Sequence, residues 1–403
     1  MESFLFLGFI LSENQLKRII EKDKFPQYQT YKFTMNLLKA LECESKYKFT
    51  YVSLQPVSDY PYYDKKKFNY SEETINILNK NYKVYNLPFY NTSILKIISR
   101  TISSLYFSIY ILKKQKNKKG IIIYSVHIPY LITGILLKKI FKLPIIGIWT
   151  DPPSVSHHME SKVKRFLRGI ELKLSKYLMK KMDKTITLTK QLAEDFCPNK
   201  PNLVIEGIID YDESKKNKIE LVKEKKIKFL YTGSLMKKYG IANIVQAFMN
   251  IDNNDIELEI YGLGDFENEL EEIALKDKRI YYGGFINNEE ILKKQTNCNF
   301  LINARSPKDI YTKYSFPSKT LEYMLSGKPL ISTFLLGMPL EYKEYFILLE
   351  DNDVKTIQET IERAIKLEKE EIQSMIERNL NFIKSKDYKN QGLKILSFLG
   401  DKI

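Results

Sequence analysis

Short apolar runs and longer amphipathic stretches alternate along the first half of this chain. The apolar runs predict buried strands, and apolar positions that recur at helical spacing predict helices between them. Strands that alternate with helices indicate a parallel sheet with helices on both faces. We expect strands at 4–10, 49–54, 83–87, 120–128, 143–151 and 184–189, with the last one closing this half, and helices at 28–41, 93–119, 128–142 and 159–182.

The same alternation restarts in the second half of the chain. The charged run 211–226 before this restart predicts a surface excursion. The chain therefore predicts an α/β protein with two parallel-sheet domains, which its 403 residues accommodate. In this half we expect strands at 228–231, 256–261, 279–286 and 299–306, and a helix at 241–250.

The segment 314–331 combines the features of a ligand site. Pro317 suits the first turn of a helix, apolar residues at helical spacing give that helix a buried face, and a glycine ends it before a buried strand. Ser318 and Lys319 stand at the open N-terminus, where free N–H groups and the helix dipole favour an anion. Glu322, one turn further on, can accept hydrogen bonds from a sugar diol. These positions together fit a bound nucleotide diphosphate.

This segment resembles the donor-nucleotide motif of GT-B fold glycosyltransferases, in particular glycosyltransferase family 4 (group 1). That family carries two glutamates at a fixed spacing. Glu322 matches the second, which binds the nucleotide ribose, and Tyr314 stands at the place of the first, which faces the donor sugar. The sequence Phe-Pro-Ser-Lys before Glu322 looks like the branch found among enzymes of bacterial surface-polysaccharide assembly. The alternative interpretation is an ordinary surface helix between two strands.

The resemblance implies further contacts to the donor phosphates. Gly233 would let the backbone approach a phosphate closely. The family's two basic residues that grip the diphosphate fall on Ser234 and Tyr239 in this chain. The charges of Lys238 and Lys319 could replace that missing pair.

Two glycine-containing loops later in the chain receive different predictions. Gly284 and Phe285 match the family's loop that borders the nucleobase. The pair Gly262 and Gly264 also follows a strand, but the helix after it begins with acidic residues. Negative charge at a helix start argues against a phosphate at that point.

Two side chains of the first half lie where parallel sheets place their ligands. His127 and Asp151 lie at the carboxyl ends of predicted strands, and ligands bind outside such ends. By resemblance, His127 belongs to the loop at the interdomain cleft, and Asp151 to a position with acceptor or sugar contacts. Alternatively, His127 caps a strand through a backbone hydrogen bond, and Asp151, which precedes two prolines, forms a plain turn.

The resemblance also implies how the chain is divided. Residues 1–206 would form an N-terminal Rossmann-like domain that binds the acceptor, and 207–386 a C-terminal Rossmann-like domain that binds the nucleotide sugar. In this GT-B architecture the two domains face a central cleft. Residues 387–403 would form a helix that crosses back onto the first domain.

The net charge of +15 is distributed unevenly. Residues 1–205 hold 34 basic and 16 acidic residues, a balance of +18, and the remainder holds 30 and 33, a balance of −3. A basic half joined to a near-neutral half predicts that the first domain faces an anionic membrane surface, although a lysine-rich background is the alternative. Nucleic acid is not an expected partner, because no recognition helix or aromatic stacking motif accompanies the charge.

Several features predict a cytoplasmic protein, soluble or peripheral on the inner face of the plasma membrane. The three cysteines are widely spaced and give no disulfide framework, and the N-terminus lacks the positive region of a signal peptide. The apolar run 101–112 is too short to span a bilayer. His157 and His158 are adjacent and have no third ligand in sight, so we expect no metal site.

These observations predict a glycosyltransferase that moves a sugar from a nucleotide-sugar donor to a hydroxyl of a glycan or lipid-linked acceptor. Retention of the anomeric configuration is implied by the resemblance alone. We expect Lys238, Lys319 and helix N–H groups to stabilise the leaving diphosphate without a metal or another cofactor. The alternative is a catalytically silent GT-B subunit that binds a glycan precursor or a partner enzyme, as the departures at Tyr314, Ser234 and Tyr239 would suggest.

Overall fold

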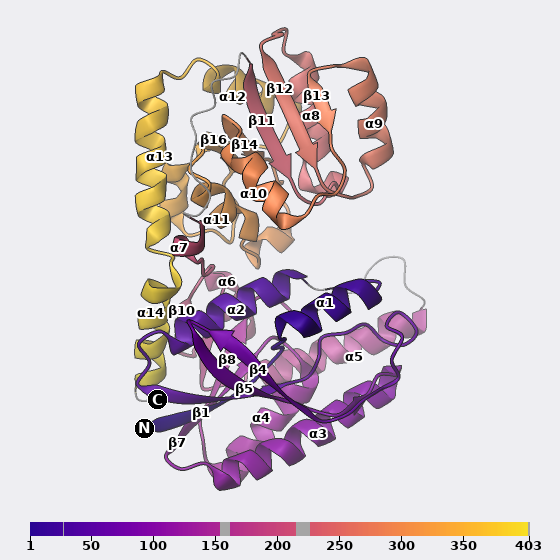
Figure 1. Cartoon of the computed structure of the whole chain (residues 1–403), viewed down its shortest axis with the longest axis vertical. Helices are drawn as coiled ribbons and strands as arrows, with labels where there is room; N and C mark the ends of the chain where they lie inside the picture. Colours follow the sequence, from indigo (N-terminus) through magenta and orange to yellow (C-terminus); the bar gives the residue numbers. More distant parts are fainter. Residues whose placement is uncertain (27, 154–161, 215–225, 402–403) are drawn as a thin grey trace. The chain divides into compact units, whose positions relative to one another are not determined.

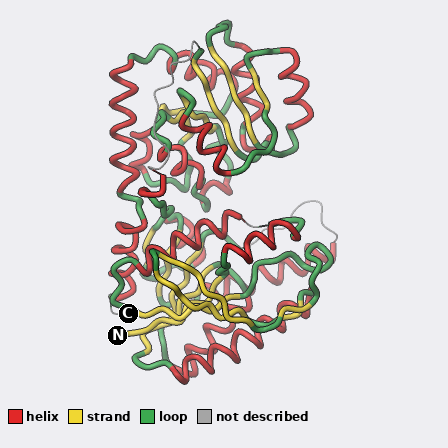
Figure 2. Tube along the Cα trace, in the orientation of Figure 1, coloured by secondary structure: helices red, strands yellow, loops and turns green. Residues whose placement is uncertain are grey.

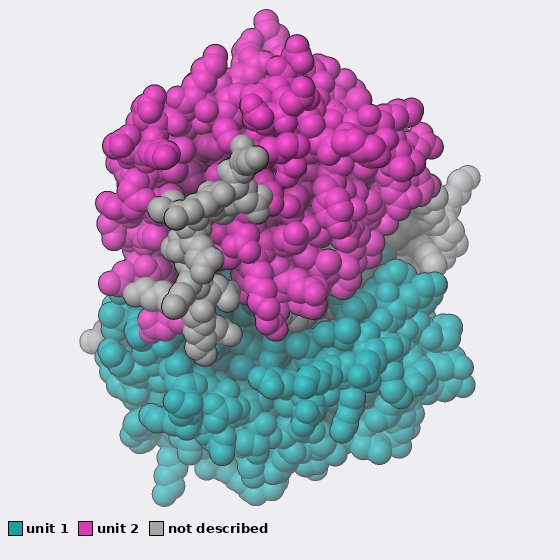
Figure 3. All heavy atoms as spheres, turned by 45° about the horizontal axis from the view of Figure 1, so that its top comes forward, with its two compact units in different colours: residues 1–208, 388–403 teal, residues 209–387 magenta. Residues whose placement is uncertain are grey.

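A computed structural model of the chain describes residues 1–26, 28–153, 162–214 and 226–401. It divides into two compact units (Figure 3). Unit 1 consists of Met1–Ile208 together with Tyr388–Ile403, and unit 2 of Ile209–Asp387. The sequence analysis placed the corresponding boundaries at 206 and 386. Unit 2 is a single stretch of chain inserted between the two parts of unit 1.

Unit 1 is built on an eight-stranded sheet in the order β10-β9-β8-β7-β1-β2-β5-β4. Neighbouring strands are parallel except for the antiparallel pair β4 and β5. Its strands are β1 (Glu2–Gly8), β2 (Tyr47–Ser53), β4 (Ser71–Ile77), β5 (Lys80–Asn86), β7 (Lys118–Tyr124), β8 (Ile145–Trp149), β9 (Lys184–Thr187) and β10 (Asn202–Val204); the short pair β3 (Lys67–Phe68) and β6 (Phe89–Tyr90) lies outside it.

Helices cover both faces of this sheet, as the alternating pattern predicts (Figures 1 and 2). One face is covered by α2 and α14, which pack against each other, and the other by α3, α4 and α5. The helices of unit 1 are α1 (Glu13–Lys22), α2 (Tyr28–Glu42), α3 (Ser93–Lys114), α4 (Ile128–Phe141), α5 (Lys162–Met179), α6 (Lys190–Phe196) and α14 (Tyr388–Gly400).

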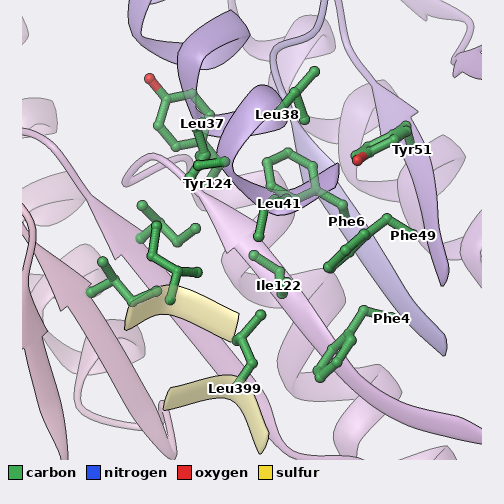
Figure 4. Close-up of a cluster of buried hydrophobic side chains, with 14 of the residues drawn as sticks. Phe4, Phe6, Leu37, Leu38, Leu41, Phe49, Tyr51, Ile122, Tyr124 and Leu399 are labelled. Atoms are coloured by element: carbon green, nitrogen blue, oxygen red, sulfur yellow. The ribbon is translucent and has the colours of Figure 1, made fainter. Parts of the chain in front are cut away.

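Aromatic and aliphatic side chains fill the space between the sheet, α2 and α14 (Figure 4). Phe4 and Phe49 stack from neighbouring strands with ring centroids 5.8 Å apart, and Leu41 and Leu399 close the cluster from the two helices. Each such side chain contributes about 1.5–3 kcal/mol when fully buried. The last helix of the chain therefore completes the core of the first unit.

Unit 2 has a six-stranded, all-parallel sheet in the order β13-β12-β11-β14-β15-β16. Its strands are β11 (Ile227–Thr232), β12 (Ile256–Tyr261), β13 (Ile280–Tyr282), β14 (Phe300–Asn303), β15 (Leu330–Thr333) and β16 (Ile347–Leu349). Its helices are α7 (Tyr211–Ser214), α8 (Ile241–Asn250), α9 (Glu267–Lys276), α10 (Asn288–Thr296), α11 (Ser318–Leu325), α12 (Val354–Ala364) and α13 (Lys369–Lys384), with 3-10 turns η1 (Lys237–Tyr239), η2 (Ile310–Lys313) and η3 (Leu340–Tyr345).

Some elements differ from the sequence-based predictions. The prediction that 184–189 is the last strand of the first half was wrong, because β10 follows it and pairs with β9. The sequence analysis also missed β4 and α1. Helix α1 begins at a capping box, in which the Ser12 hydroxyl accepts from the Gln15 backbone N–H and the Gln15 side chain accepts from the Ser12 backbone N–H.

One helix among the described residues is long and apolar enough to cross a membrane by length and composition. It is the stretch Leu95–Lys114 of α3, with a mean hydropathy of 1.2. The sequence analysis judged the run 101–112 too short, because it stopped at the charged residues Arg100 and Lys113, which the helix nevertheless includes. About a third of this stretch, 33%, is buried inside unit 1.

Two glycines on helices give a matched stability test. A Cβ added at Gly392 of α14 would lie 2.4 Å from the Ala40 carbonyl oxygen of α2, whereas one at Gly169 of α5 would meet nothing within 4 Å. We expect Gly392→Ala to lower the free energy of unfolding of unit 1 by roughly 1–3 kcal/mol through overpacking. Gly169→Ala should raise it by about 0.5–1 kcal/mol through helix propensity.

Fluorescence during urea unfolding measures both variants, because Trp149, the sole tryptophan, is buried in β8 of unit 1. A Gly392→Ala variant as stable as Gly169→Ala would contradict the close α2–α14 crossing.

Candidate functional site

Three loops of unit 2 meet at the carboxyl edge of its sheet. The Gly233 N–H after β11 donates to the Tyr261 carbonyl oxygen at 2.9 Å, and the Gly262 N–H after β12 donates to the Gly284 carbonyl oxygen at 2.9 Å. Gly233, Gly262 and Gly284 all have positive φ, which glycine adopts without steric cost. A Cβ at Gly262 would lie 1.6 Å from the Gly233 carbonyl oxygen, so no side chain at Gly262 fits between the two loops.

Lys319 lies directly against the first of these loops. Its Nζ donates to the Thr232 hydroxyl at 3.1 Å, and its Cε would be 2.9 Å from a Cβ built on Gly233. Thr232 is fixed in turn by Tyr323 of α11, whose hydroxyl accepts from the Thr232 N–H at 2.8 Å and donates to its carbonyl oxygen at 2.9 Å. Helix α11 and the end of β11 thus form one rigid element that presents an ammonium group.

The N-terminus of α11 is open. Pro317 stands at the N-cap with no side-chain cap hydrogen bond, Ser318 is exposed and Lys319 is half-buried. Pro317 has no N–H, so the first N–H groups of the helix come from Ser318 and Lys319. The N–H groups of the first helical turn and an ammonium at one helix start provide positive charge for an anion with several oxygens.

Glu322 is held in position one turn into α11. Its Oε1 accepts a hydrogen bond of 2.9 Å from the side-chain amide of Gln295, at the end of α10. Gln295 is completely buried, whereas Glu322 is half-buried, so the carboxylate is oriented by a partner in the protein interior. A carboxylate with a fixed oxygen can accept from two neighbouring hydroxyl groups. The sequence analysis did not identify Gln295.

Another cation lies at the same sheet edge, and the sequence analysis missed it. Arg305 follows β14 closely, and its guanidinium lies 4.5 Å from the Tyr239 ring centroid. Tyr231 in β11 is buried, and burial raises its pKa to about 12 although the nearby Arg305 lowers it. A basic residue directly after a strand in a parallel sheet was the available signal.

The remaining predicted donor residues occupy varied positions. Ser234 is exposed, and its carbonyl oxygen accepts from the Tyr231 hydroxyl at 2.8 Å. Lys238 is exposed on η1, with Nζ 5.1 Å from the Tyr239 ring centroid. Phe285 is 74% exposed beside Gly284.

Tyr314 is half-buried at the end of η2, below the Lys313 ammonium. At the Gly262-Gly264 loop, the Gly264 N–H donates to the Glu267 carboxylate at 2.5 Å.

His127 of unit 1 lies after β7 at the carboxyl edge, at the N-cap of α4, where its side chain makes no cap hydrogen bond. Its Nε2 is 3.5 Å from an Arg100 guanidinium nitrogen. Burial, followed by the nearby cations Arg100 and Lys96, lowers the pKa of His127 well below its usual value of about 6.5. Since guanidinium can only donate, we assign the proton to Nδ1, which has no hydrogen-bond partner among the described residues.

The charged groups near His127 come from α3 and the loop after β2. Arg100 is buried and donates to the Gln55 carbonyl oxygen at 2.7 Å. Lys96 is buried too, and its Nζ lies 2.6 Å from Asp59 and 2.7 Å from a backbone carbonyl oxygen. Sequence reasoning missed these two cations, although their spacing of four residues on an apolar helix was a signal.

Asp151 lies after β8, the neighbour of β7, and is exposed. Its carboxylate accepts from the Thr150 hydroxyl at 2.9 Å. The two predicted residues of unit 1 therefore follow adjacent strands at the same sheet edge. His157 and His158 lie outside the described residues.

One hollow in unit 2 lies away from this edge. A cavity of about 280 Å³ is lined by Lys228, Glu259, Lys294 and Cys298. Lys228 stands at the beginning of β11 and Cys298 precedes β14, so the cavity lies at the amino ends of the strands. Within the described ranges, no group of three His, Cys, Asp or Glu side chains could hold a metal ion.

Comparison with known proteins agrees with this arrangement. Residues 212–382 match the family model described as glycosyl transferases group 1. An uncharacterized glycosyltransferase of Methanocaldococcus jannaschii is 27% identical over 246 residues, which cover 54% of this chain and 59% of that protein. The match thus spans about three fifths of the length of this curated relative.

Solved structures share the fold of the whole chain. Sucrose-phosphate synthase from Thermosynechococcus elongatus has a TM-score of 0.64 at 13% identity, covering 98% of this chain and 97% of its own. The trehalose-6-phosphate structure from E. coli bound with UDP-2-fluoro glucose has a TM-score of 0.65 at 12% identity, covering 100% of each chain. The predicted GT-B architecture is confirmed by these matches.

The depressed pKa of His127 leads to a pH-dependent stability. The unfolded chain binds a proton at about pH 6.5 and the folded chain only at lower pH, so stability is complete above 6.5 and falls as the pH decreases below it. Between pH 6.5 and 5, the free energy of unfolding of unit 1 should fall by about 1 kcal/mol per pH unit more in the parent than in His127→Gln. Urea unfolding followed by Trp149 fluorescence measures this slope, and equal slopes would contradict a neutral His127.

Proposed function

We propose that this chain, in which a group 1 glycosyl transferase domain forms most of unit 2 in a GT-B fold, transfers a sugar from a nucleotide-sugar donor to a hydroxyl group. The acceptor we propose is a glycan or a lipid-linked glycan precursor. The reaction would belong to polysaccharide or glycoconjugate biosynthesis, with retention of the anomeric configuration.

The observation that carries this proposal is the placement of Lys319 and Glu322 on the same helix, α11. The Lys319 side chain, at the N-terminus of the helix, lies against the loop at Gly233, where a diphosphate would bind. Glu322, oriented by Gln295, stands one helical turn away, where the ribose diol of the same nucleotide would bind. The exposed ring of Phe285 and the open backbone at Gly284 would border the base.

Catalysis in this proposal is electrostatic. Breaking the bond between sugar and diphosphate leaves negative charge on the phosphate oxygens, and preorganised donors stabilise that charge. Lys319, Lys238 and the α11 N–H groups would supply them, and Arg305 adds a cation at the same edge. Because these cations come from the chain itself, we propose that no metal ion or other cofactor is needed.

The residues of unit 1 would act on the acceptor side of the reaction. His127 is uncharged at neutral pH, so it can orient a hydroxyl without repelling the cations beside it. The exposed carboxylate of Asp151 can accept a proton or hydrogen bond from the attacking hydroxyl. We further propose that the basic first unit works against an anionic membrane surface on the cytoplasmic side.

A catalytically silent subunit remains the second candidate, and Tyr314 and Tyr239 favour it. Both tyrosines stand where the resemblance leads one to expect a charged residue, and Arg305 lies over the Tyr239 ring. A silent subunit would bind the nucleotide but would release no nucleoside diphosphate from any nucleotide-sugar donor.

Thermal-shift measurement with UDP, GDP, ADP and CDP tests donor binding, and Glu322→Ala tests its geometry. We expect one nucleotide to stabilise the parent, and Glu322→Ala to weaken its binding by ~1.5–3 kcal/mol because a charge-assisted pair is lost. Glu322→Gln should weaken it less.

The matched control is Glu362→Ala, which removes a carboxylate that also accepts from a glutamine amide, but on α12. If none of the four nucleotides stabilises the parent, donor binding is rejected. Equal affinities of parent and Glu322→Ala would reject the ribose assignment.

Lys319→Met should distinguish a diphosphate contact from a surface charge. We expect affinity for the nucleoside diphosphate to fall about tenfold or more, and affinity for the monophosphate to change by less than about threefold, since the outer phosphate lies nearer the sugar. Isothermal titration with both ligands gives the comparison. Lys355→Met, on exposed α12, is the control. Equal losses for both ligands would contradict the assignment.

A further inference from the structure

Helix α3 exposes apolar side chains and buries polar ones, the reverse of an ordinary surface helix. Its apolar side chains Ile98, Ile102 and Tyr106 follow one another at four-residue spacing and are 49%, 64% and 67% exposed. Residues at this spacing share one helix face. The buried face instead carries polar residues over most of its length, before the buried Leu112, namely Lys96, Arg100, Ser103, Ser104 and Ser108.

Contacts inside unit 1 account for the polar face of α3 but not for its apolar face. Lys96 and Arg100 are held by backbone carbonyls and Asp59, and α4 packs closely against α3. Nothing in unit 1 covers the outward Ile and Tyr side chains among the described residues. A soluble helix normally turns its polar side to water, so this face indicates a partner.

Helix α5 repeats the pattern on the same side of the sheet. Phe166, Ile170 and Tyr177 share one face and are 70%, 50% and 58% exposed. Helix α4 packs against both α3 and α5, and its Ile140 is 54% exposed. We call the three α3 residues and the three α5 residues the outer stripe.

Positive charge accompanies the outer stripe. Helices α3, α4 and α5 contain four, two and six Lys or Arg residues, and Glu171 is their single acidic residue. Lysines stand beside exposed tyrosines: Lys114 donates to the Tyr110 hydroxyl, and Lys181 lies 4.8 Å from the Tyr177 ring centroid. Apolar and aromatic residues with flanking lysines are typical of segments that lie in the plane of a membrane interface.

We propose that the outer stripe is the surface that docks on an anionic lipid bilayer. Its isoleucine, phenylalanine and tyrosine side chains enter the headgroup region, and the surrounding lysines contact lipid phosphates. Helix α3 lies along the membrane, because its polar face remains packed in unit 1. A second copy of the chain fits this surface less well, since an isologous interface would place these lysines against themselves.

The inference rests on the proposed function in one respect, because a lipid-linked acceptor is the reason for docking. Beyond that function, it names the residues that contact the membrane and the way they contact it. Charge alone would give binding that high salt abolishes. An inserted apolar stripe gives binding that depends on anionic lipid and yet survives in part at high salt.

Sedimentation of the full chain with vesicles tests this surface. We expect the parent to bind vesicles of phosphatidylcholine mixed with phosphatidylglycerol, and to bind phosphatidylcholine alone much less. The triple variant Ile98→Gln, Ile102→Gln and Tyr106→Gln should bind the mixed vesicles at least about tenfold more weakly. The matched control Leu275→Gln, Leu336→Gln and Leu340→Gln removes exposed leucines of unit 2 and should leave binding unchanged.

The outcomes separate this inference from the proposed function. Trp149 fluorescence and nucleotide thermal shifts should be unchanged in the triple variant; if it fails to fold, Lys173→Gln with Lys176→Gln, both exposed, must reduce binding instead. Vesicle binding by the parent without any nucleotide binding would reject the proposed function and leave the docking surface standing. Parent-like binding by the triple variant, equal binding to neutral vesicles, or a dimer that the triple variant disrupts would overturn the docking surface.

Discussion

The close backbone approach at the carboxyl edge of the second sheet is the constraint on which the proposed donor site depends. Gly233 and Gly262 touch through backbone atoms, and Lys319 fills the space that a side chain at Gly233 would need. Tyr323 then fixes α11 to β11 through both polar backbone groups of Thr232. The ammonium, the helix N-terminus and Glu322 consequently stand on one helix that is fixed to β11.

Much of this arrangement was predictable from the sequence, because local rules and tertiary packing agree there. Helix 241–250 was predicted with the bounds that the structure gives, and the loop, helix, turn and strand around Glu322 were predicted from Pro317, the apolar spacing and Gly327. Parallel sheets also place strand ends at one edge, and the sequence predicted His127 and Asp151 at such ends; in the structure β7 and β8 stop at Tyr124 and Trp149, shortly before them.

The parts that were missed depend on contacts between distant residues. Gln295 and Glu322 are far apart in the sequence, and Arg305 meets Tyr239 only through the order of the strands. Helix α3 was predicted as a helix, but its spacing could not show that the polar side faces inward. That orientation follows from carbonyl groups at Gln55 and Val57, which the helix meets only in the folded unit.

The inserted arrangement of unit 2 has a consequence for synthesis on the ribosome. Its two ends meet, since Ile209 pairs with Asp387 and donates its N–H to the Lys386 carbonyl oxygen, so unit 2 can close as soon as its own stretch has emerged. Unit 1 cannot, because Leu37 and Leu41 need α14 to cover them. Most of unit 1 is therefore synthesised first, but its folding is completed last. Its apolar helix surfaces stay exposed to solvent while unit 2 is translated.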